Sequence, residues 1–109
     1  MKPNETTNSS YLSQDAPTLA KYGRMRRTYL KENKKILYNQ MLLNDTLWPH
    51  LLEVDQQAND MMDTIIDRMK KERGVTERLK ANDQWRWIQE MGNIRNAAEE
   101  FVLREVVFA

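Results

Sequence analysis

The sequence predicts an all-α fold, a small antiparallel bundle of three to five helices with one long central helix. Apolar residues recur at intervals of three and four along most of the chain, which is the spacing of helices that bury one face. Only 3 Gly and 3 Pro occur among 109 residues, so few positions break a helix. Short polar segments with helix-capping residues separate the apolar patterns, as expected for helices joined by tight connections.

The first residues carry no helical pattern. Residues 1–10 are polar and lack periodicity, so we expect a disordered tail, followed by a single helical domain over residues 11–109. Within that domain, residues 11–19 contain Pro17 and scattered apolar residues, and we interpret them as an extended arm on the helices. From about Ala20 one face of a helix collects Tyr22, Met25, Tyr29 and Ile36. Asn33 is a point of interruption, so the pattern fits one helix to Leu43 or two shorter ones.

The most clearly defined element is a long helix over residues 47–73. Its apolar stripe has nearly heptad spacing and comprises Leu47, Leu51, Val54, Ala58, Met61, Met62, Ile65 and Met69. Asn44, Asp45 and Thr46 supply a turn before it, and Pro49 suits its first turn. Gly74 is placed to end it in a left-handed conformation. The stripe fits packing within the chain or a homodimer equally well.

Two further helices are expected near the C-terminus. Thr76 is placed to cap a short helix that ends at Ala81, and Asn82 or Asp83 to cap the last helix. One face of the last helix carries Trp87, Met91, Ile94, Ala98, Phe101 and Val102. The chain then ends in Val106, Val107 and Phe108, which fit either a short strand paired with the 11–19 arm or a final buried turn.

Composition excludes several function classes. The chain has no Cys and one His, which excludes disulfides, thiol nucleophiles and multi-histidine sites. His50 and Glu53 lie one helical turn apart, but two ligands do not make a metal site. We therefore expect no enzyme, no cofactor and no metal. No apolar run approaches the roughly 20 residues of a membrane span, and residues 1–10 lack the apolar core of a signal peptide, so we expect a cytoplasmic protein without membrane contact.

A formal net charge of +1 conceals strong segregation along the sequence. Residues 1–44 carry a net charge of +5, residues 45–67 of −6, residues 68–80 of +4 and residues 81–109 of −2. Six cations of the first block fall on one side of a continuous helix, opposite its apolar side: Lys21, Arg24, Arg27, Lys31, Lys34 and Lys35. Such a basic stripe fits a phosphate backbone. A solvated face, or a face paired with the acidic helix, explains it as well.

The long helix and the last helix offer a second kind of surface. An acidic column on the long helix comprises Glu53, Asp60, Asp63 and Asp67, with Gln56 among them. It fits pairing with the basic stripe, plain solvated surface, or binding of a positively charged partner. Trp85 lies off the apolar stripe of the last helix, so it packs under the short helix or stands exposed as an anchor for a partner protein.

From about Tyr29 onward the chain carries a series of recognisable segments. In the first half they are residues 29–32 (YLKE), Val54-Asp55 and Gln57-Ala58. In the second half they are residues 74–77 (GVTE), residues 79–81 (LKA), Trp87, Met91, residues 93–95 (NIR), Glu100 and Val102, and the chain ends with residues 105–108 (EVVF). In this order the segments resemble the TnpV family of transposon-encoded proteins. The resemblance implies a small accessory protein of mobile elements in Gram-positive bacteria, and it supplies no catalytic residues.

Two functions are consistent with these observations. The first is a non-catalytic accessory protein of a mobile element that associates with DNA in transposition, excision or its regulation, and binds it through the basic stripe. No helix-turn-helix pattern is evident. The alternative is a small protein that binds and inhibits a host defence protein, for example an anti-CRISPR protein acting on an effector nuclease. The acidic column and Trp85 would then contact the partner.

Overall fold

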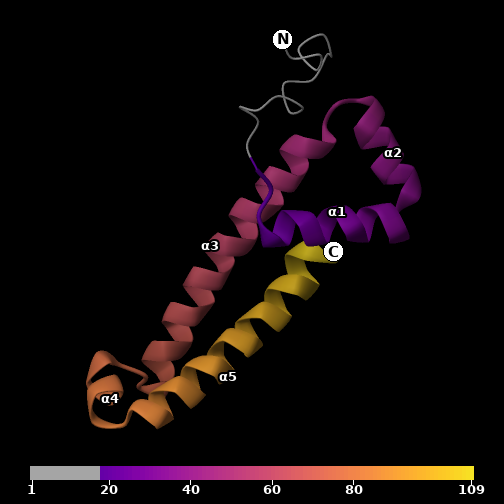
Figure 1. The fold of residues 1–109 in the computed structure, drawn as a ribbon. Coiled ribbons are helices and arrows are strands. Elements are labelled where there is room, and N and C mark those ends of the chain that lie inside the picture. The colour runs from indigo at the N-terminus through magenta and orange to yellow at the C-terminus, as the bar shows by residue number, and fades with distance from the viewer. Residues whose placement is uncertain (1–17) are drawn as a thin grey trace, which may run out of the picture. The chain divides into compact units, whose positions relative to one another are not determined.

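The elements that the computed structural model describes are all helices (Figure 1). It describes residues 18–109. In chain order the elements are α1 (Lys21–Asn33), α2 (Lys35–Leu43), α3 (Leu47–Arg73), α4 (Glu77–Asn82), α5 (Gln84–Val102) and the π-helical turn η3 (Leu103–Val107). The predicted all-α bundle with one long helix is confirmed. The expected tail at residues 1–10 and most of the 11–19 arm lie outside the described residues.

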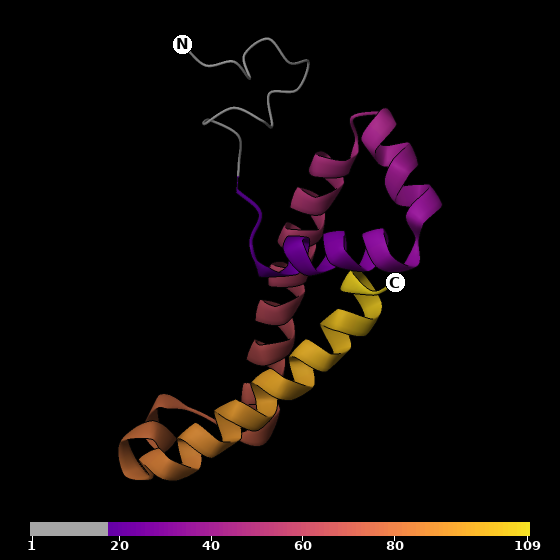
Figure 2. The same ribbon diagram turned by 45° about the vertical axis from the view of Figure 1, so that its right-hand side comes forward.

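The chain divides into two compact units, residues 1–56 and 57–109, and the division falls inside α3. In the first unit, α1, α2 and the start of α3 form three sides of a triangle (Figure 1, Figure 2). Its core consists of Leu19, Leu30, Leu47 and Leu51. Leu30 and Leu51 are fully buried, and burial of a leucine side chain contributes roughly 2 kcal/mol. The single domain that the sequence suggests over residues 11–109 stays a prediction.

In the second unit, the rest of α3 runs beside α5 in the opposite direction, and α4 joins them (Figure 1). The core consists of Val75, Met91 and Ile94, with Ile66 and Met69 of α3 packed against it. Met69, Met91 and Ile94 come from the apolar spacing that predicted the two long helices, because positions three and four apart share one face. Val75, between α3 and α4, and Ile66 were not among the predicted apolar positions.

The helix ends agree with the capping residues. The hydroxyl of Thr76 accepts a hydrogen bond from the backbone N–H of Leu79 at 3.2 Å, and a carboxylate oxygen of Asp83 accepts one from Arg86 at 3.2 Å. Gly74 follows α3 with a φ of 66°, the left-handed conformation that glycine adopts without strain. Local sequence therefore decides where these helices begin and end.

The first apolar pattern does not form one helix. Lys34 has φ −135° and ψ 59°, which ends α1, and α2 starts in a new direction at the next residue (Figure 1). The two-helix alternative is thus the correct one. Tyr22 is buried as expected, but Ile36 is 78% exposed, because the break removes it from the buried face of α1.

The last helix buries four of the six residues expected on its apolar face. Met91, Ile94, Ala98 and Val102 are buried, whereas Phe101 is 40% exposed, because its position falls at the edge of the stripe. Of the two alternatives for the chain end, the strand does not form, since Val106 and Val107 lie in η3. Val107 is fully buried, which matches the alternative of a final buried turn.

Candidate nucleic-acid interface

Helix α1 is anchored at its N-terminus by a carboxylate from α3. Asp55 accepts hydrogen bonds from the backbone N–H of Ala20, at 2.8 Å, and of Gly23, at 2.5 Å. The first N–H groups of a helix lack partners within the helix, and the N-cap residue Ala20 has no side chain that accepts one. Asp55 is only 8% exposed. It therefore supplies the missing cap from a distant part of the sequence and fixes the start of α1 on α3.

Gly23 makes this approach sterically feasible. A Cβ atom at this position would lie 2.5 Å from Oδ2 of Asp55 and 2.9 Å from the backbone oxygen of Leu51. Both distances are shorter than non-bonded carbon and oxygen atoms tolerate. Glycine costs about 1 kcal/mol of helix propensity relative to alanine, but here it makes room for the carboxylate cap.

A second polar contact joins the same two helices. Nε of Arg26 donates a hydrogen bond to Nε2 of His50 at 3.2 Å. Burial lowers the pKa of His50, the positive charge of Arg26 lowers it further, and Glu53 opposes the effect. Burial also lowers the pKa of Arg26. His50 therefore accepts this hydrogen bond as the neutral imidazole, and protonation would place two cations in contact.

We expect the protein to lose stability as the pH falls through about 6.5, the ordinary pKa of histidine. Below this pH the unfolded chain binds a proton at His50, while the folded chain, with its lowered pKa, still resists it. The unfolded state then binds more protons, so acid favours unfolding until the folded-state pKa is passed. Urea midpoints at about pH 7.5 and 5.5 would measure the loss. The variant His50→Gln should lose less; an equal loss would rule out His50 as its source.

The outward face of α1 presents four of the six predicted cations: Lys21, Arg24, Arg27 and Lys31. They lie opposite the face that buries Tyr22, Arg26 and Leu30. Lys21, Arg24 and Lys31 are exposed, and Arg27 is half-buried. One guanidinium nitrogen of Arg24 also donates to the backbone oxygen of Leu19 at 2.8 Å, which holds its side chain near the start of the helix. We call these four residues the α1 basic face.

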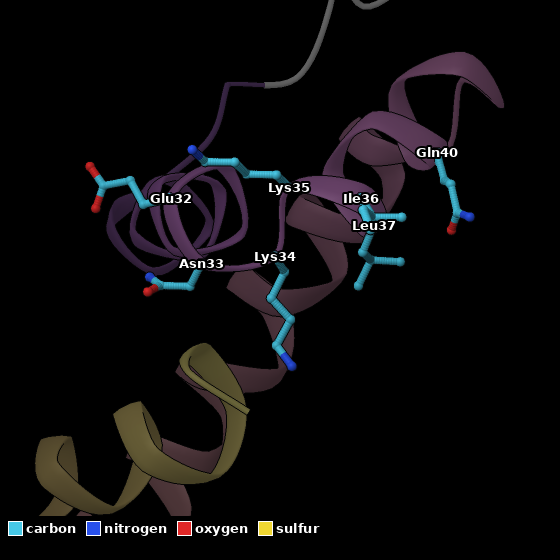
Figure 3. A pocket seen from close by; sticks show the side chains of 7 residues that line it. All are labelled: Glu32, Asn33, Lys34, Lys35, Ile36, Leu37 and Gln40. Carbon is cyan, nitrogen blue, oxygen red and sulfur yellow. The ribbon is translucent and has the colours of Figure 1, made fainter.

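The other two predicted cations do not continue this face. Lys34 sits at the break between the helices and Lys35 begins α2, so the continuous stripe of six is corrected to four. Figure 3 shows the two side chains pointing away from each other at the α1–α2 corner. Lys35 still lies near Lys31, since both line one open hollow of about 570 Å³ together with Thr28 and Glu32.

The acidic column remains a row of exposed side chains along α3. Glu53, Asp60, Asp63 and Asp67 are all exposed. Asp67 pairs with Lys71 of its own helix at 3.2 Å, and exposed pairs of this kind contribute only about 0–1 kcal/mol. Trp85 is 82% exposed. Of its two predicted placements, the exposed one is therefore correct.

Sequence reasoning missed Asp55, Arg26 and the contact of His50. A signal was present for Asp55, which stands four residues after Leu51 and three before Ala58, within the apolar stripe of α3. A carboxylate on a buried face requires hydrogen-bond donors, and the start of α1 provides them. Among residues 18–109, no three His, Cys, Asp or Glu side chains come together in a way that would hold a metal ion. No helix in that range combines the length and apolar composition that a bilayer crossing requires.

Comparison with protein-family models identifies the relatives of this chain. The model of the transposon-encoded protein TnpV matches residues 10–107. The chain belongs to the TnpV family. The match extends the resemblance, which began at Tyr29, to nearly the whole length of this transposon-encoded protein. The comparison with curated proteins found no match, and neither did the comparison with solved structures.

Several residues that carried the TnpV resemblance have structural roles. Asp55 caps α1, Thr76 caps α4 and Gly74 ends α3. Met91 and Ile94 form the core of the second unit. These residues therefore stabilise the fold of this chain, and a binding surface has to be formed by exposed side chains.

Proposed function

We propose that this TnpV protein is a non-catalytic, cytoplasmic accessory protein of a transposon that associates with DNA in transposition, excision or its regulation. The observation that carries the proposal is the α1 basic face. The four cations lie on the side of α1 opposite its buried residues, and the helix is held at its start by Asp55 and at its middle by the contact between Arg26 and His50. A helix whose backbone is already held in place presents its cations without the further entropy cost of folding on binding.

The spacing of the face suits phosphate contacts. From Lys21 to Lys31 the helix rises about 15 Å, and duplex DNA carries one negative charge per roughly 1.7 Å of its axis. The guanidinium groups of Arg24 and Arg27 are suited to bidentate contacts with phosphate oxygens. Contacts of this kind position a protein on DNA and carry no base sequence information. The proposal is therefore for backbone binding, with site selection left to other transposon proteins.

We expect the protein to bind a duplex oligonucleotide at low salt, and the affinity to fall steeply as salt rises. For three to four phosphate contacts, log K should decrease with log salt at a slope of about −3. Fluorescence anisotropy of a labelled duplex, titrated at several salt concentrations, measures both quantities. Absence of binding at the lowest salt, or binding that salt does not weaken, would contradict the proposal.

A second candidate function is the binding and inhibition of a host defence protein, for example as an anti-CRISPR protein that acts on an effector nuclease. The exposure of Trp85 favours it, because an exposed tryptophan is a preferred anchor at protein interfaces. The exposed carboxylates of the acidic column also resemble a row of phosphate groups in their negative charge.

Capture of partners from host lysate, with and without nuclease treatment, separates the two candidates. A protein partner should survive nuclease treatment and be lost with Trp85→Ala, while this exposed change should leave the free energy of unfolding within about 0.5 kcal/mol. Charge reversal of the acidic column tests the resemblance to nucleic acid. If binding survives both changes, these surfaces do not contact the partner.

A further inference from the structure

Two large apolar side chains stand uncovered on the outer face of α2 in the described part of the chain. No residue of α2 is buried. Tyr38 and Met41 pack against the core of the first unit, whereas Ile36 and Leu43, on the opposite side, are 78% and 87% exposed. The two positions are seven apart in the sequence, so their side chains lie on one line along the helix. A helix that is apolar on both sides is ordinarily buried on both.

We propose that the outer face of α2 pairs with the same face of a second copy of this chain, with the two helices antiparallel. Gln40 lies between Ile36 and Leu43 on the same line and is exposed. In an antiparallel pair, Ile36 of each copy packs against Leu43 of the other, and the two Gln40 side chains meet near the twofold axis. A side-chain amide both donates and accepts hydrogen bonds, so two glutamines can satisfy each other there.

The charges at the two ends of α2 support a second copy of the chain as the partner, and an antiparallel arrangement of the two helices. Lys34 and Lys35 stand at the N-terminal end, and Asp45 follows the C-terminal end. All three are exposed. Antiparallel pairing brings Lys35 of each copy beside Asp45 and the last carbonyl groups of the other α2, where a cation is favourable. Parallel pairing would instead place the lysines of both copies together. The surface is thus complementary to itself, as a twofold interface requires.

The small size of the surface indicates a weak dimer. Stable complexes bury about 800 Å² on each partner, and a nine-residue helix supplies only part of that area. The hollow of about 520 Å³ at the α1–α2 corner, which Ile36 and Leu37 line (Figure 3), adjoins the face and gives room for the second copy. We therefore expect a monomer–dimer equilibrium rather than a permanent dimer.

The absence of Cys from the sequence allows a direct test by single-cysteine variants under mild oxidation. Gln40→Cys should form a disulfide-linked dimer at least about tenfold faster than Arg78→Cys, an exposed control on α4, because pairing raises the effective concentration. Ile36→Cys mixed with Leu43→Cys should cross-link faster than either variant alone. A rate for Gln40→Cys equal to the control would overturn the proposal. Faster cross-linking of Ile36→Cys with itself would overturn the antiparallel direction.

Sedimentation analysis of the unmodified protein provides a second, independent readout. The average mass should rise with concentration, and Ile36→Glu with Leu43→Glu should raise the dimer dissociation constant at least about tenfold. Because the side chains of Ile36 and Leu43 are mostly exposed, the double variant should keep the helicity of the unmodified protein, as measured by circular dichroism. A protein that stays monomeric, or a mass that the double variant leaves unaffected, would contradict the pairing. The face would instead bind a lipid surface if the unmodified protein is monomeric and floats with uncharged lipid vesicles, while the double variant does not float with them.

Discussion

Replacing Asp55 by alanine is expected to lower the free energy of unfolding by about 3 kcal/mol. The backbone N–H groups of Ala20 and Gly23, which lie at the start of α1, would lose the acceptor that caps the helix and fixes it on α3. Asp55→Asn should lose less, because its amide oxygen can still accept one of the two hydrogen bonds. Urea denaturation, followed by circular dichroism, measures the free energy of unfolding of the unmodified protein and of the two variants.

Asp63→Ala is the matched control for this change. Asp63 lies on the same helix and is exposed, so removal of its carboxylate should change the free energy of unfolding by no more than about 0.5 kcal/mol. A loss for Asp55→Ala no larger than for Asp63→Ala would mean that the carboxylate does not cap α1 in solution.

Replacing Gly23 by alanine is expected to cost about 2 kcal/mol, because the added Cβ collides with Asp55 and with the backbone of Leu51. Helix propensity alone predicts the opposite sign, a gain of about 1 kcal/mol. Gly92→Ala is the matched control, since nothing lies within 4 Å of a Cβ atom at that helical position. We expect Gly92→Ala to stabilise the protein and Gly23→Ala to destabilise it in the same denaturation experiment.

The two changes should not be additive. Once Asp55 is alanine, the Cβ at position 23 no longer meets the carboxylate, although the Leu51 oxygen at 2.9 Å remains. The double variant should therefore be more stable than the sum of the single effects predicts. Simple additivity would show that Gly23 and Asp55 act independently, and would contradict the close contact between them.

The parts of the fold that the sequence predicted well are those decided locally. The bounds of α3 follow from its apolar spacing and from Gly74 after its last residue. The caps of α4 and α5 follow from Thr76 and Asp83, because a side-chain oxygen beside the first helical turn acts within three residues. The exposed face of α1 could be predicted in the same way from its own sequence, because the helical period decides which positions share a face.

The parts that were missed depend on partners far along the chain. The start of α1 has no capping side chain of its own, and its cap comes from Asp55, 32 residues beyond Gly23. The sequence left one helix or two open at Asn33, because the packing of Tyr38 and Met41 of α2 on the first core cannot be read from local sequence. Ile36 was consequently assigned to the wrong surface, and the six-cation stripe lost its last two members.

We propose that the α1 basic face contacts DNA phosphates, and two matched variants with the same loss of positive charge provide the test. The test variant replaces Arg24, Arg27 and Lys31 by glutamine. The control variant removes the same net charge from the second unit. In it, glutamine replaces the exposed residues Arg68, Arg73 and Arg78. Circular dichroism would check that both variants remain folded. The measured quantity is the slope of log K against log salt for duplex DNA.

We expect the α1 variant to lose about 2–3 from the magnitude of that slope, because each lost phosphate contact removes about 0.9, while the control variant keeps the slope of the unmodified protein. Equal slopes for the two variants would rule out the α1 basic face as the DNA contact, since DNA would then respond only to net charge.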